Sequence, residues 1–134
     1  MSEKKRSVLI VDDEFHIGIL IRKLVHWEEL GMECMDVLNN GEAALRMIRE
    51  QNPDIVITDV RMPKVNGLDL IKAARDAGMR TCFIIISGYK EFEYAHKALA
   101  YGVEDYILKP VSEQELNDTL GKIRTSWMSM SSRR

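Results

Sequence analysis

The chain has 134 residues, of which 46% are hydrophobic, so it is long and apolar enough to form one globular domain with a substantial core. Its formal net charge of −2 gives no general electrostatic basis for binding nucleic acid. No apolar stretch approaches the roughly 20 residues of a membrane span, and the run from Val8 to Val11 is too short for a signal peptide. These features favour a cytoplasmic protein.

The cysteines and histidines give no pattern of metal ligands. Cys34 and Cys82 lie far apart in the sequence and match no metal-binding spacing, so we expect two buried thiols in a reduced, intracellular protein. His16 and His26 both fall in the first predicted helix and have no partner at a usable ligand spacing. We therefore expect both histidines at the surface or at its boundary.

Short apolar runs alternate with helical patterns along the whole chain. The runs predict strands at 8–11, 32–37, 55–57, 83–86 and 106–108, of which the second is weaker and is expected at a sheet edge. Leu20 belongs to the apolar stripe of the first predicted helix, and Leu99 belongs to that of the fourth. The predicted helices end near Gly31, before Pro53, at Gly78 and at Gly102, and the last begins at a capping box of Ser112 and Glu115.

This alternation predicts an α/β fold with a doubly wound, five-stranded parallel sheet and helices on both faces. Right-handed crossovers limit the topology to a few arrangements. Since the chain contains no sequence repeat, low-complexity segment or linker, we expect a single domain over residues 1–134.

Four of the predicted strands end in polar residues. Asp12 and Asp13 follow the first strand, Asp59 the third, Ser87 the fourth and Lys109 the fifth. Because parallel strands point the same way, these ends gather at one edge of the sheet, although each residue alone is an ordinary strand-end polar group. Clustered carboxylates repel one another unless a hard cation such as Mg²⁺ binds them, and that cation suits a site that receives a phosphoryl group. An ammonium and a hydroxyl complete such a site.

The stretches VLIVDDE, PDIVITDVRMP, NGLDL, IIISGY and GVEDYILKP resemble the receiver domain of two-component response regulators over about residues 6–128. The stretch 86–111 is most similar to receivers that precede AraC-type DNA-binding domains. The resemblance implies a flavodoxin-like (βα)5 fold with strand order 2-1-3-4-5, flanked by a short charged N-terminal tail and a short C-terminal tail.

The resemblance also implies the roles of the acidic residues. Asp59 is expected to be the phosphoacceptor. Asp13, Asp59 and the backbone carbonyl of Arg61 are expected to bind Mg²⁺, while Asp12 acts largely through metal-bound water.

The remaining roles fall on the last two strands. By resemblance, Lys109 pairs with the phosphoryl group, Ser87 is the switch hydroxyl and Tyr106 is the switch aromatic residue. A cis peptide bond between Lys109 and Pro110 is expected to aim the lysine into the pocket.

The resemblance implies a signalling module and not an independent enzyme, although it would assist its own phosphorylation and dephosphorylation. A sensor histidine kinase is the expected donor, and the surface of helix 92–102, strand 106–108 and the last helix is expected to change. The output is expected to be transcription through a DNA-binding domain absent from this chain, with phosphorylation-dependent homodimerisation as a further expectation. We expect no direct nucleic acid or membrane binding by this domain.

Two other functions compete with this interpretation. A receiver-shaped binding module can signal without phosphorylation, but it need not retain all the polar strand ends. A Mg²⁺-dependent phosphohydrolase would need a second acid or base near the nucleophile, and position 61 holds Arg and not Asp. An excised receiver and a stand-alone receiver are both compatible with the sequence.

Overall fold

The structure is a computed structural model that describes residues 5–88 and 92–132. Its five strands form one sheet in the order β2-β1-β3-β4-β5, and all neighbouring pairs are parallel. This confirms the predicted α/β fold, the strand order and the edge position of the second strand. The strands are β1 (Arg6–Val11), β2 (Met32–Leu38), β3 (Ile55–Asp59), β4 (Cys82–Ser87) and β5 (Asp105–Leu108).

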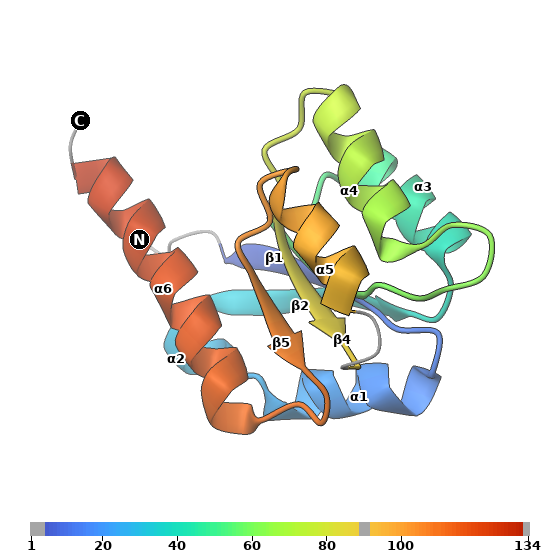
Figure 1. Cartoon of the computed structure of the whole chain (residues 1–134). Helices are drawn as coiled ribbons and strands as arrows, with labels where there is room; N and C mark the ends of the chain where they lie inside the picture. Colours follow the sequence, from blue (N-terminus) through green and yellow to red (C-terminus); the bar gives the residue numbers. More distant parts are fainter. Residues whose placement is uncertain (1–4, 89–91, 133–134) are drawn as a thin grey trace.

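Helices cover both faces of the sheet (Figure 1). Buried side chains of α1, α2 and α6 pack against one face, and those of α3, α4 and α5 pack against the other. The helices are α1 (Phe15–Leu24), α2 (Trp27–Leu30), α3 (Gly41–Gln51), α4 (Gly67–Asp76), α5 (Phe92–Leu99) and α6 (Glu113–Ser132). Among the described residues, no helix has both the length and the apolar character needed to cross a bilayer.

The continuous apolar runs are explained by this layering. In β1, Val8 and Ile10 belong to the core layer under α1 and α6, while Leu9 and Val11 belong to the layer under α3 and α4. Successive strand side chains point to opposite faces, so a strand covered on both sides must be apolar at every position. The central strand β3 is buried along its whole length, and Asp59 is its last residue.

The prediction of a single first helix that ends near Gly31 is wrong. The helix α1 ends at Leu24, Val25 is extended, and a second short helix, α2, follows. Val25 has extended backbone angles (φ −71°, ψ 134°) and its side chain is buried in the core. The Asn117 side chain replaces the lost helical hydrogen bonds, since it accepts from His26 N at 2.8 Å and donates to Leu24 O at 2.9 Å. Tertiary contacts with α6 therefore override the helical spacing in this segment.

One residue in each of two predicted apolar stripes does not face the sheet, although Ile21 of the first stripe is buried. Leu20 is 43% exposed and Leu99 is 49% exposed. Small residues make the close contacts instead: Gly18 and Ala98 are buried, and a Cβ at Gly18 would lie only 2.7 Å from Val37 Cγ1. Hydrophobic spacing alone does not mark these small residues as part of the packing face.

The thiols of Cys34 and Cys82 are half-buried and unbridged, and not fully buried as predicted. Burial raises the pKa of both thiols above the ordinary value. His16 and His26 are exposed, as expected, and His26 Nε2 lies 2.7 Å from Glu113 Oε2.

Candidate functional site

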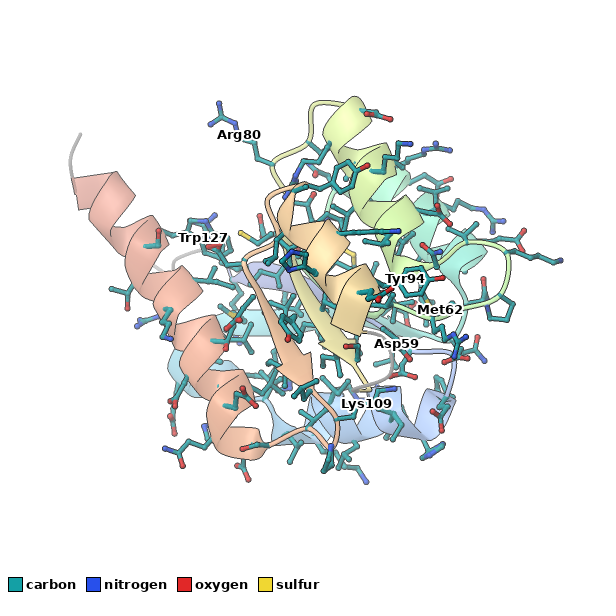
Figure 2. All side chains as sticks on the ribbon, viewed as in Figure 1. Asp59, Met62, Arg80, Tyr94, Lys109 and Trp127 are labelled. Atoms are coloured by element: carbon teal, nitrogen blue, oxygen red, sulfur yellow. The ribbon has the colours of Figure 1, made fainter. Side chains whose placement is uncertain are left out.

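The polar strand ends gather at the carboxyl edge of the sheet, as the sequence predicted. Asp12 follows β1, Asp59 ends β3, Ser87 ends β4 and Lys109 follows β5. Asp59 pairs with Ile86 in the sheet register, so the ends of β3 and β4 lie side by side. Figure 2 shows the labelled side chains of Asp59 and Lys109 converging at this edge.

Lys109 joins the two buried carboxylates of the site. Its Nζ donates to Asp59 Oδ2 at 3.0 Å and lies 3.3 Å from Asp12 Oδ2. Asp12 is fully buried and Asp59 is 4% exposed. The peptide bond from Lys109 to Pro110 is cis, as expected.

Burial dominates the electrostatics of this edge. It raises the pKa of Asp59 to about 6, although the hydrogen bond from Lys109 opposes the rise. Burial raises the pKa of Asp12 as well, against the hydrogen bond from Glu14 N and the charge of Lys109. For Lys109, burial acts to lower the pKa, but the hydrogen bond and charge of Asp59 outweigh it and the net direction is upward. Above its pKa of about 6, the ionised Asp59 carboxylate shares the Lys109 ammonium with the Asp12 carboxyl group.

The carboxylate oxygens beside this pair form a donor set for a hard cation. Asp12, Asp13 and Glu14 each offer an oxygen within 4.8 Å of the others. Within the described part of the chain, Asp12 Oδ2 makes no hydrogen bond, although it contacts Lys109. Carboxylate oxygens are the ligands that Mg²⁺ prefers, so this acidic group fits the cation.

Glu14 was not among the predicted site residues, although its place in the acidic run Asp12-Asp13-Glu14 was a signal. Its backbone N–H donates to Asp12 Oδ1 at 2.9 Å, and its Oε1 lies 4.0 Å from Lys109 Nζ. Glu14 thus orients one carboxylate of the site and adds negative charge near the shared ammonium.

The loop after β3 holds Asp59 in place. The backbone N–H of Arg61 approaches Asp59 Oδ1 at 3.3 Å. Asn66 and Asp69 form a reciprocal capping box that starts α4. A Cβ at Gly67 would lie only 2.5 Å from Asp59 O, so only glycine allows the loop to pack this closely against the strand end.

Ser87 and Tyr106 lie on the same face of the sheet. Tyr106 pairs with Ile85, two residues before Ser87, and its side chain is half-buried against the core layer of α3, α4 and α5. Ser87 is fully buried, and its Oγ has no hydrogen-bond partner among the described residues. A buried hydroxyl without a partner is costly, so Ser87 Oγ is available to an oxygen that enters the site.

Comparisons with known proteins agree with this geometry. The family model described as "Response regulator receiver domain" matches residues 8–121. The uncharacterized transcriptional regulatory protein YesN of Bacillus subtilis is 41% identical over 117 residues, which cover 87% of this chain and 32% of that protein. The transcriptional regulatory protein HptR of Staphylococcus aureus is 36% identical over 118 residues, which cover 87% of this chain and 46% of that protein.

A solved structure is similar over nearly the whole chain. The REC domain of AraT, a response regulator from Geobacillus stearothermophilus, is 36% identical with a TM-score of 0.88, and the match covers 94% of this chain and 98% of that one. The chain thus spans an entire solved domain but only about a third to a half of the length of YesN and HptR.

Proposed function

Because the chain belongs to the response regulator receiver domain family, whose general function is phosphorylation-controlled signalling, we propose that Asp59 accepts the phosphoryl group. The family is a regulatory domain and not an enzyme, so phosphorylation changes the state of the domain itself. The observation that carries the proposal is the 3.0 Å contact between Asp59 Oδ2 and Lys109 Nζ within a largely buried edge. It sets a carboxylate nucleophile beside a counter-ion for phosphoryl oxygens.

The proposed reaction is in-line transfer from a phosphohistidine of a sensor kinase. Asp59 is ionised above its pKa of about 6, so it is a nucleophile at neutral pH. One Asp59 oxygen forms a bond to phosphorus while the bond from phosphorus to the histidine nitrogen breaks, and the imidazole leaves with the electron pair. Lys109 then pairs with a phosphoryl oxygen. Catalysis of this kind rests on positioning and electrostatics.

Receiver domains generally bind Mg²⁺, which when bound offsets the charge of the phosphoryl oxygens. We assign Asp13, Asp59 and the backbone carbonyl of Arg61 as its ligands, with Asp12 acting through a bridging water. The 4.8 Å grouping of Asp12, Asp13 and Glu14 supports the part of this assignment that concerns Asp12 and Asp13, and it does not include Asp59. The same residues would assist hydrolysis of the aspartyl phosphate, which resets the domain.

The proposed switch runs from Ser87 to Tyr106. The buried Ser87 hydroxyl would turn toward a phosphoryl oxygen, and the Tyr106 ring would move inward from its half-buried position. This movement would change the surface formed by α5, β5 and α6. A phosphoryl group adds up to two negative charges and three acceptor oxygens, which one hydroxyl and one ammonium can bind.

The proposed partners follow from the relatives. YesN and HptR are named as transcriptional regulatory proteins, so we assign this chain a sensor histidine kinase and a DNA-binding output domain, of AraC type by sequence resemblance. Phosphorylation-dependent homodimerisation is part of this proposal. We assign the domain to the cytoplasm, as is typical of response regulators.

Phosphorylation by acetyl phosphate with Mg²⁺, followed by intact-protein mass spectrometry, tests the proposal. The wild-type chain is expected to gain one lasting phosphoryl group, and Asp59→Asn is expected to gain none. Asp76→Asn, on an exposed residue of α4, is the matched control and is expected to label normally. Undiminished labelling of Asp59→Asn refutes the assignment, an unlabelled wild type favours a phosphorylation-independent module, and rapid continuous phosphate release favours a hydrolase.

A further inference from the structure

Arg75, near the end of α4, binds three backbone carbonyls, one four residues away at Met79 and two in the distant turn at Tyr101 and Gly102. Its Nε donates to Tyr101 O at 2.9 Å, its second guanidinium nitrogen to Met79 O at 3.1 Å, and its third to Gly102 O at 3.2 Å. Tyr101 and Gly102 belong to the turn that follows α5 and leads into β5. The guanidinium also lies 5.4 Å from the centre of the buried Phe83 ring. One side chain therefore ties α4, β4 and the end of α5 together.

The contact places a cation just beyond the C-terminus of α5, where it binds carbonyls of the following turn. The last carbonyls of a helix lack intrahelical donors and carry the negative end of the helix dipole, so a cation there is favourable. Gly102 has a φ of +77°, which turns the chain and leaves its carbonyl free for Arg75. The planar fork of arginine holds several acceptors at fixed angles, which lysine cannot do.

Two features of the described part of α5 hold its C-terminal end in place. Ala98, near the C-terminal end, is fully buried, and the bonds from Arg75 follow it directly. Tyr94, in the first half of the helix, is 43% exposed, and Figure 2 shows it at the surface. The chain enters α5 from the carboxyl edge, after Ser87 at the end of β4. The helix is thus fixed at the end that lies away from the candidate site.

We propose that Arg75 is the pivot of the switch: a positioning residue that fixes the C-terminal end of α5, so that phosphorylation moves the helix about that end. An eight-residue helix is about 12 Å long, so a small displacement near Ser87 becomes a rotation of the whole exposed face. Because Arg75 also fixes the start of the segment that leads into β5, this rotation and the inward movement of Tyr106 become one event. The inference rests on the proposed function and adds a residue to its relay.

The test compares Arg75→Met with Arg80→Met, which removes the same charge from a neighbouring exposed residue that Figure 2 shows pointing away from the body. Arg75→Lys is the second variant, because it keeps the charge and loses the fork. Each protein is loaded with beryllofluoride, and amide chemical shifts of α5 and β5 are recorded with and without it. Phosphorylation by acetyl phosphate is measured on the same samples.

For Arg75→Met and Arg75→Lys we expect normal phosphorylation, and a beryllofluoride-induced shift change over α5 and β5 that falls to less than half of wild type. Hydrogen exchange at residues 98–103 is expected to be faster than in Arg80→Met. A purely structural role would lower the melting temperature but leave the beryllofluoride response intact, and that result in either variant overturns the pivot. If beryllofluoride changes no amide shift in the wild-type protein, that result refutes the proposed function and the pivot together. If Arg75→Met does not fold, Arg75→Lys decides the question.

Discussion

The two ends of β3 each carry a part-buried or buried aspartate, and the two are held in opposite ways. Asp54, just before the strand, accepts hydrogen bonds from Ser7 N at 2.8 Å and Ser7 Oγ at 3.3 Å, and its own N–H donates to Ser7. Asp59, at the other end, is 4% exposed and shares one ammonium with a second buried carboxylate. The same residue type thus stabilises the fold at one end of the strand and is electrostatically costly at the other.

This difference separates stability from function. A carboxylate that receives neutral donors from the adjacent strand needs no further ligand. A buried pair of carboxylates with a single ammonium is short of positive charge, and burial, the largest cause, raises the pKa of both carboxyl groups. A divalent cation can relieve this shortage of positive charge, so the costly end of the strand is the end that responds to a ligand.

Removal of the shared ammonium should have the largest effect on the free energy of unfolding. Lys109→Met leaves Asp12 and Asp59 together without a positive partner, and we expect it to lower the free energy of unfolding by about 3 kcal/mol at pH 8. Urea unfolding measures this loss. Millimolar Mg²⁺ should restore more stability to the variant than it adds to wild type, and equal Mg²⁺ effects on both proteins would contradict the account.

Neutralisation of Asp59 should raise the free energy of unfolding, in contrast to the removal of Lys109. The pKa of Asp59 is raised from 3.8 to about 6, so the folded state binds this proton more tightly than the unfolded state, and wild type loses stability as pH rises through this window. Asp59→Asn avoids this loss and should be more stable in the metal-free form by about 1–3 kcal/mol above pH 6.

Urea unfolding at several pH values tests this sign. The advantage of Asp59→Asn over wild type should shrink as the pH falls toward 3.8. An advantage that stays the same at every pH would mean that the ionisation of Asp59 is not its cause.

Asp54, whose carboxylate already accepts hydrogen bonds from Ser7, should contribute to stability and not to phosphorylation. Asp54→Ala removes the acceptor for Ser7 N and Oγ, and we expect a loss of about 1–2 kcal/mol in the free energy of unfolding. Labelling by acetyl phosphate should proceed at the wild-type rate under conditions where the variant is folded. Impaired labelling would show that the two ends of β3 are not independent.

Much of this arrangement follows from the sequence. Asp12, Asp59 and Lys109 each stand at the end of a buried apolar run. Because parallel strands all end at the same edge of the sheet, the sequence predicts that these three residues lie together. What could not be predicted depends on contacts between distant segments. The break at Val25 follows from an amide on α6, and the bonds of Arg75 reach carbonyls 26 and 27 residues away.

Local spacing also placed single residues on the wrong face. Leu20 is exposed, whereas Gly18 and Ile21 of the same helix are buried, and a Cβ at Gly18 would lie 2.7 Å from Val37 Cγ1. Glu14 could not be predicted for a different reason: the resemblance implies roles only for Asp12 and Asp13 in this acidic run.

The identity of the acceptor is tested most directly by chemical trapping. Borohydride reduces an aspartyl phosphate to homoserine, which marks the modified position permanently. After phosphorylation with acetyl phosphate and Mg²⁺, reduction and peptide mass spectrometry should find homoserine at position 59 and unmodified aspartate at positions 12, 13 and 54. Homoserine at any of those three positions, with Asp59 unmodified, would contradict the assignment of Asp59 as the phosphoacceptor.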